Sequence, residues 1–155
     1  MTKNLLLVYH TQSGNTGRLA AAAAAGARHP DIDDVDLRVL RASDAGADDL
    51  RWAHGVLLGT PENFGYMSGA LKDFFDRTFY AVEGELLPLP YALFVSAEND
   101  GTGAVSAVQR IVGGYPLVEV QPPLIVRGAK VDEQDQQLAH DLGMTLAAGL
   151  SAGIY

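Results

Sequence analysis

The amino-acid sequence contains no cysteine. This absence excludes disulfide bridges, thiolate metal centres and cysteine nucleophiles. The sequence also lacks a long apolar run: the longest, residues 19–25, is short and mostly alanine, whereas a membrane-spanning helix needs about 20 apolar residues. The N-terminal region has neither the length nor the small-residue cleavage site of a signal peptide. We therefore expect a cytoplasmic protein without a transmembrane helix.

Positive charge is scarce as well. Lysine and arginine together number 11 against 19 acidic residues, which gives a net charge of -8. Such a surface repels nucleic acid and anionic membranes, so we expect neither as a partner. The acidic balance is compatible with docking on basic redox proteins, and solubility alone explains it equally well.

The remaining composition is that of one globular domain. Apolar residues make up 48% of the 155 residues, enough to bury a sizeable core, and we predict a single domain over residues 1–155. Short apolar runs predict buried strands, and apolar residues at helical spacing predict helices. The predicted strands are residues 4–9, 35–40, 55–59, 91–96 and an interrupted fifth strand, 117–120 with 124–126. The predicted helices are residues 17–28, 43–53, 68–80, 104–112 and 131–148.

This alternation predicts an α/β fold, a doubly wound parallel sheet with helices on both faces. The strand at 35–40 alternates apolar and charged residues and is expected at an edge. Ser43-Asp44 and Ser68 are the expected N-caps of their helices, and the aromatic stripe of helix 68–80 is expected in the core. The alanine-rich helix is expected to pack closely on the sheet.

The most informative stretch is the loop at residues 11–16, Thr-Gln-Ser-Gly-Asn-Thr, between the first strand and the first helix. Thr11, Ser13 and Thr16 offer hydroxyl donors, Gly14 lets the backbone approach a ligand, and Asn15 or Thr16 can cap the helix. The first N–H groups of a helix lack internal partners and favour an anion. No cation lies inside the loop, so a phosphate would be held by dipoles and hydroxyls. The alternative is an ordinary well-capped turn.

Two further loops follow strand ends, at residues 60–67 and 97–103. In doubly wound sheets, ligands bind beyond the carboxyl ends of the strands. We therefore expect the three loops to form one site. Within it, Glu98 and Asp100 are more simply solvated acids than a metal pair. His10 adjoins the site and is expected to be a local hydrogen-bonding residue.

These motifs resemble those of the flavodoxin-like FMN proteins. The resemblance rests on Thr11 to Thr16, on Gly59-Thr60-Pro61, on the segment from Phe64 to Lys72, and on Asp76-Arg77-Thr78. The second stretch is most similar to the tryptophan-repressor-binding-protein-like, type IV NAD(P)H:quinone oxidoreductases; short-chain flavodoxins are also similar. The resemblance implies a flavodoxin-like, five-stranded parallel sheet of order 2-1-3-4-5, with FMN as the cofactor.

The resemblance also implies which residues hold FMN. Its phosphate would lie on Thr11, Gln12, Ser13, Gly14, Asn15 and Thr16. Its isoalloxazine ring would lie against Thr60, Pro61, Glu62, Asn63, Phe64 and Gly65. The pyrimidine side of the ring would face Ser96, Ala97, Glu98, Asp100 and Gly101.

The implied function is an FMN-dependent oxidoreductase that passes electrons from NAD(P)H to a quinone or similar small acceptor. We expect the protein to assemble as a homodimer. One alternative is a flavodoxin-type electron carrier that docks on redox proteins. The third loop contains no aromatic residue to cover the flavin, which disfavours the carrier. Glu62 and Asn63 stand where the quinone reductases have threonine and arginine, which removes a charge that could meet a pyridine nucleotide. A second alternative is a non-redox site for another phosphate ligand.

Overall fold

The computed structural model describes all residues, 1–155. Its strands are β1 (Lys3–Tyr9), β2 (Val35–Arg41), β3 (Gly55–Asn63), β4 (Tyr66–Met67), β5 (Leu89–Ala97), β6 (Leu117–Glu119) and β7 (Leu124–Arg127). Its helices are α1 (Asn15–Ala27), α2 (Ala47–Trp52), α3 (Gly69–Val82), α4 (Thr102–Val112) and α5 (Glu133–Ser151). None of the helices combines the length and the apolar character needed to cross a membrane.

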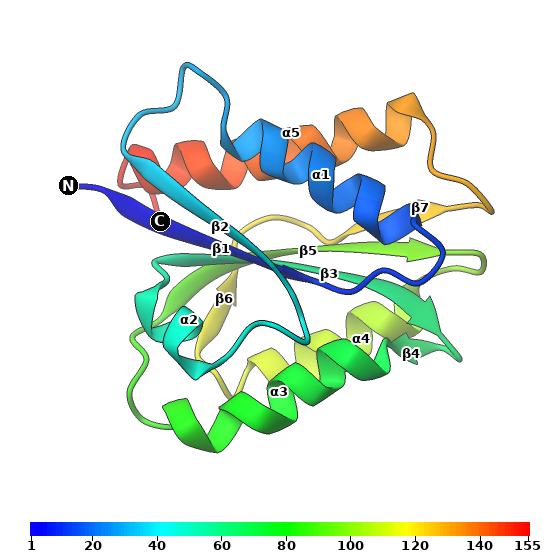
Figure 1. The fold of residues 1–155 in the computed structure, drawn as a ribbon, viewed down its shortest axis with the longest axis horizontal. Helices are drawn as coiled ribbons and strands as arrows, with labels where there is room; N and C mark the ends of the chain where they lie inside the picture. The colour runs from blue at the N-terminus through cyan, green and yellow to red at the C-terminus, as the bar shows by residue number, and fades with distance from the viewer.

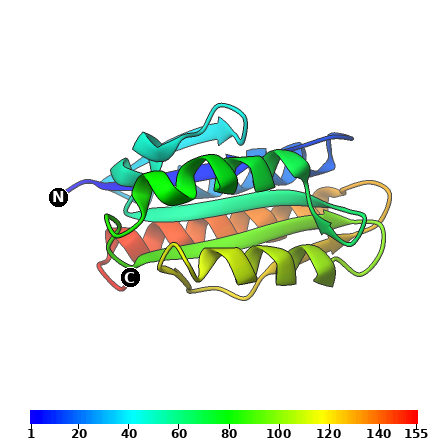
Figure 2. The ribbon, with the colours of Figure 1, turned by 90° about the horizontal axis from the view of Figure 1, so that it is seen from below.

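The strands form a parallel sheet in the order β2-β1-β3-β5-β6, with β7 also paired to β5. Counted over the five predicted strands, this is the expected order 2-1-3-4-5, and β2 lies at the expected edge. Helices α1 and α5 cover one face of the sheet, and α2, α3 and α4 cover the other (Figure 1). Seen from below, α3 and α4 lie side by side across their face (Figure 2). The predicted doubly wound fold is confirmed.

The central strands are apolar throughout because both of their faces are buried. Leu6, Val8 and Leu58 belong to the core on the side of α3 and α4. Leu5 and Leu7 belong to the core under α1 and α5. The two-residue period of a strand therefore divides β1 between two separate cores.

The alanine tract of α1 packs on the sheet as expected and also allows close contact with α5. A Cβ on Gly26 would overlap the carbonyl oxygen of His140, and one on Gly143 would overlap that of Ala23. Small residues on both helices therefore set how closely they approach. The aromatic stripe of α3 lies in the opposite core, where Phe74 and Phe75 are buried.

Two of the predicted helix starts were wrong. Helix α1 has Gly14 as its N-cap, in a left-handed conformation (φ 102°), and no side chain caps it. Helix α2 begins at Ala47, directly after its N-cap Gly46. The Gly46 N–H donates to the carboxylate of Asp49. Ser43-Asp44 therefore caps nothing. The prediction for α3 is confirmed, since the Ser68 hydroxyl accepts from the Leu71 N–H.

The region predicted as a loop at 60–67 contains regular structure. Strand β3 continues to Asn63 and turns back into the short antiparallel strand β4. The interrupted fifth strand is confirmed: β6 and β7 both pair with β5, on either side of the break at Pro122-Pro123. The break follows because proline cannot donate to a ladder of strand hydrogen bonds.

Candidate functional site

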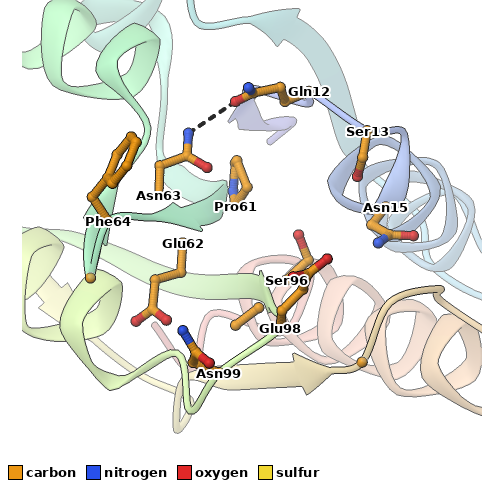
Figure 3. Close-up of a pocket in the computed structure, with 13 residues that line it drawn as sticks. Gln12, Ser13, Asn15, Pro61, Glu62, Asn63, Phe64, Ser96, Glu98 and Asn99 are labelled. Atoms are coloured by element: carbon orange, nitrogen blue, oxygen red, sulfur yellow. Dashed lines mark hydrogen bonds between the residues drawn. The ribbon is translucent and has the colours of Figure 1, made fainter.

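The three loops meet at the carboxyl edge of the sheet and enclose a cavity of about 440 Å³. The chain termini lie at the opposite edge (Figure 1). Thirteen residues line the cavity: Gln12, Ser13, Asn15, Pro61, Glu62, Asn63, Phe64, Gly65, Ser96, Ala97, Glu98, Asn99 and Gly128 (Figure 3). The lining is mostly polar, as expected for a phosphate-bearing ligand.

Most of the predicted site residues lie in this lining, but six do not. These are Thr11, Gly14, Thr16, Thr60, Asp100 and Gly101. Asn99 and Gly128 line the cavity and were not predicted. Asn99 lies inside the loop at 97–103, and Gly128 directly follows β7. The rule that ligands bind at strand ends could therefore have found both.

In the first loop, two of the three hydroxyls have protein partners. The Thr11 hydroxyl accepts from the Gly17 N–H at 3.0 Å. The Thr16 hydroxyl shares a 2.7 Å hydrogen bond with that of Ser96, and only 1% of the Thr16 surface is exposed. Ser13 is exposed and its hydroxyl has no partner within the protein. Ser13 is therefore the hydroxyl of this loop that has no protein partner, whereas the Thr11 hydroxyl accepts one hydrogen bond and keeps its own proton to donate.

Asn15 connects the first loop to the segment after β7. Its amide donates to the Ala129 carbonyl at 3.0 Å, and its oxygen accepts from the Val131 N–H at 3.1 Å. This arrangement explains why Asn15 does not cap α1: the side chain spans a gap between loops more than a hundred residues apart in sequence. These two hydrogen bonds hold the segment after β7 beside the first loop, so that Gly128 lies at the edge of the cavity.

The second loop is a hairpin whose turn is Phe64-Gly65. Both residues have positive φ angles, 53° and 69°, which the tight turn requires and which is unusual for phenylalanine. The Phe64 ring is fully exposed at the rim of the cavity. Asn63 holds the hairpin to the first loop, because its amide donates to the Gln12 side-chain oxygen at 3.1 Å (Figure 3).

Glu62 joins the hairpin to the third loop. Its carboxylate accepts from the N–H groups of Gly101, Gly103 and Ala104, at 3.3, 3.1 and 3.4 Å. These N–H groups open α4, so Glu62 supplies the cap that α4 lacks in its own sequence, and its negative charge complements the helix dipole. The carboxylate reaches the third loop, which also carries Asn99 (Figure 3).

The remaining polar groups brace the loops from within. The fully buried Thr60 hydroxyl accepts from the Ser68 N–H and donates to the Pro61 carbonyl. The Asp100 carboxylate accepts from both the N–H and the hydroxyl of Thr102, and these bonds lower its pKa. Asp100 thus stabilises its own turn. Glu98 is exposed and makes no hydrogen bond to the protein.

His10 differs from the expectation that it is a local hydrogen-bonding residue. Its backbone N–H donates to the Gly59 carbonyl, but its side-chain Nδ1 is buried without a partner. Burial, followed by the charge of Arg41, lowers the pKa of His10 below its usual 6.5. The side chain therefore favours the neutral form.

These residues fit the parts of FMN. The cavity volume lies within the range of roughly 300–1,000 Å³ for cofactor sites. Gly14 and the uncapped start of α1 offer backbone N–H groups to a phosphate. The backbone of the hairpin and of residues 96–99 offers donors and acceptors to the polar edge of a flavin ring. Which residues touch the cofactor stays a prediction.

Comparison with known proteins agrees with this fit. The family model described as NADPH-dependent FMN reductase matches residues 6–129. A flavodoxin from Aquifex aeolicus is 34% identical over 108 residues, which cover 70% of this chain and 57% of that protein. An NAD(P)H dehydrogenase (quinone) from Acidithiobacillus ferrooxidans is 31% identical over 118 residues, covering 64% of this chain and 59% of that protein.

Among solved structures, the WrbA-like flavodoxin from Agrobacterium tumefaciens superposes with a TM-score of 0.77 at 19% identity. It covers 98% of this chain and 99% of that one. At this identity the likeness shows the fold alone. The chain spans less than two thirds of the length of the two sequence relatives. The family match itself extends from β1 to the segment after β7 and includes all three loops, so this chain belongs to the NADPH-dependent FMN reductase family.

Proposed function

We propose that this protein is an FMN-dependent oxidoreductase that takes electrons from NAD(P)H and passes them to a quinone or a similar small acceptor. FMN is the cofactor that membership of the family implies. When bound, FMN supplies the redox chemistry, and the protein supplies binding, orientation and electrostatics. The observation that carries the proposal is the meeting of the 11–16 loop and the hairpin at one polar cavity.

In this proposal the first loop binds the FMN phosphate. Ser13 contributes its free hydroxyl, and the N–H groups at the start of α1 contribute the dipole. Thr11, Gly14 and Thr16 hold the loop in shape from behind. The hairpin from Thr60 to Gly65 lies along the ring, held by the Thr60 hydroxyl and the Glu62 carboxylate. The segment from Ser96 to Gly101 lies beside the pyrimidine part.

An open ring face supports a small-molecule acceptor. The loop at 97–103 carries no aromatic side chain, so a nicotinamide or a quinone can stack on the flavin from that side. Phe64, exposed at the rim, offers an apolar surface to an aromatic acceptor. We further propose that the protein works in the cytoplasm, where NAD(P)H is available. We also propose that it assembles as a homodimer.

The test is an absorbance spectrum. Purified protein is mixed with FMN, desalted, and then treated with NADH or NADPH under anaerobic conditions. We expect a flavin band that survives desalting and bleaches promptly with one of the two nucleotides, and that returns when a quinone is added. A protein that retains no flavin band contradicts the proposal.

A second candidate is an electron carrier of the flavodoxin type. The relative named flavodoxin and the net charge of -8 favour it, since an acidic face suits docking on basic proteins. In this case the bound flavin bleaches slowly with NADPH alone. It bleaches quickly once a flavodoxin reductase is added. The ratio of the two rates separates the carrier from the reductase.

A further inference from the structure

Arg18 lies against the phosphate loop although it is not part of it. It belongs to the first turn of α1, and its Nη1 donates to the Asn15 side-chain oxygen at 3.1 Å. A Cβ placed on Gly14 would lie 3.7 Å from the same Nη1. The guanidinium therefore folds back over Gly14 and Asn15. No cation lies inside the loop at residues 11–16, as the sequence shows, but this one lies directly beside it.

This cation has no carboxylate partner. Ion pairs join Arg38, Arg51, Lys72 and Arg77 to aspartate or glutamate. Arg18 forms no such pair, and it shares this with six other cations of the chain, Arg28 at the far end of the same helix among them. Its single hydrogen bond to a side chain is the one to Asn15, which leaves most of its five N–H donors free.

Arg18 also lies at the end of the helix that repels it. The N-terminus of a helix carries partial positive charge and favours acidic residues. Helices α2 and α5 follow this rule, with Asp48 and Asp49 in the first turn of α2 and Glu133 and Asp135 in that of α5. Helix α1 has no acidic residue in its first turn, as is also true of α3 and α4. An arginine there becomes favourable when an anion is bound at the loop.

We propose that Arg18 binds the phosphate group of FMN and makes the site select FMN over riboflavin. This inference rests on the proposed FMN site at residues 11–16. The guanidinium pairs with the phosphate dianion and offsets the unfavourable field of the acidic protein. Riboflavin has the same ring and ribityl chain without the phosphate, so it gains nothing from Arg18.

The experiment compares dissociation constants. Apo-protein is titrated with FMN and with riboflavin, followed by the quenching of flavin fluorescence, at low and at high sodium chloride. The variants are Arg18→Gln and a matched control, Arg28→Gln, an exposed arginine at the far end of α1. We expect Arg18→Gln to weaken FMN binding about tenfold at low salt. Riboflavin binding stays unchanged, and Arg28→Gln behaves as the wild type.

A second measurement separates binding from a structural role. Because Arg18 is repelled by its own helix, the melting temperature of the Arg18→Gln apo-protein should equal or slightly exceed that of the wild type. Equal losses for FMN and riboflavin, or no loss for either, would overturn the inference while leaving FMN binding by the wild type intact. A wild-type protein that binds no flavin overturns the proposed function as well.

Discussion

Ser13 is the residue whose chemistry the site depends on most directly. The Thr11 hydroxyl accepts from the Gly17 N–H and the Thr16 hydroxyl bonds to that of Ser96, whereas Ser13 lines the cavity and its hydroxyl has no protein partner. This division of roles could not be predicted, because the three hydroxyls look equivalent in the sequence. It depends on where the chain returns from β5.

We predict that Ser13→Asp weakens FMN binding by about 100-fold, because a carboxylate close to a phosphate costs several kcal/mol at the effective dielectric of a protein surface. The asparagine of Ser13→Asn has nearly the same shape as that aspartate but carries no charge, so this variant should bind FMN far more tightly than Ser13→Asp. Titration with FMN measures both variants, and circular dichroism checks that the apo fold is kept. Normal FMN binding by Ser13→Asp would refute the phosphate assignment.

His10 makes stability depend on pH. Because burial lowers its pKa in the folded protein, the unfolded chain binds the proton more readily below about pH 6.5. The free energy of unfolding should therefore fall as the pH drops below that value, and recover as the pH rises above it.

His10→Gln removes this part of the dependence. Urea unfolding at about pH 7.5 and about pH 5.5 should show a smaller loss of stability for the variant than for the wild type. The other histidines are the same in both proteins, so any contribution from them cancels in the comparison. If both proteins lose the same free energy of unfolding at the lower pH, protonation of His10 does not contribute to the pH dependence.

At the scale of elements, the hairpin β3–β4 and helix α4 behave as one unit through Glu62. Strand β3 was predicted to end at Gly59 because its apolar run ends there. The polar residues Thr60 to Asn63 continue the strand because they pair with β5 and β4. The N-cap of α4 is Gly101, which has no side chain, so that helix has no side-chain cap of its own. A glutamate from another element fills the role.

Glu62→Gln should therefore lower the free energy of unfolding by about 1–3 kcal/mol, since buried N–H groups lose a charged acceptor. FMN affinity should fall too, because two walls of the cavity separate. Glu98→Gln is the matched control, as Glu98 also lines the cavity but bonds to nothing in the protein. Urea unfolding and FMN titration measure both. Equal stability of the two variants would contradict the role of Glu62.

At the scale of the whole molecule, the proposed FMN site joins three loops that the free protein holds together with only a few hydrogen bonds. Binding to the folded state alone stabilises it by about 2.7 kcal/mol at a ligand concentration 100 times the dissociation constant. For a chain of this length that corresponds to a rise in melting temperature of about 5–10 °C. Thermal unfolding with and without FMN tests this. Inorganic phosphate at the same concentration, as a control, should shift the melting temperature far less.

The sequence by itself determined the layers and the edge where the site lies. Those features follow from local signals: apolar runs for buried strands, helical spacing for helices, and polar loops at strand ends. The resemblance of short motifs added the strand order, which the structure confirms, and the cofactor, which the family match supports. The position of the break in the fifth strand also followed locally, from Pro122-Pro123.

Only the tertiary structure decided what each polar side chain of the site does. Thr16 meets Ser96, Asn15 meets residues 129–131, and Glu62 meets the start of α4. These partners are far apart in sequence, so no periodicity or propensity encodes the pairing. The same packing brought Gly128 to the cavity. A hydrogen bond depends on where two chain segments meet in space, and that is fixed only once the sheet has assembled.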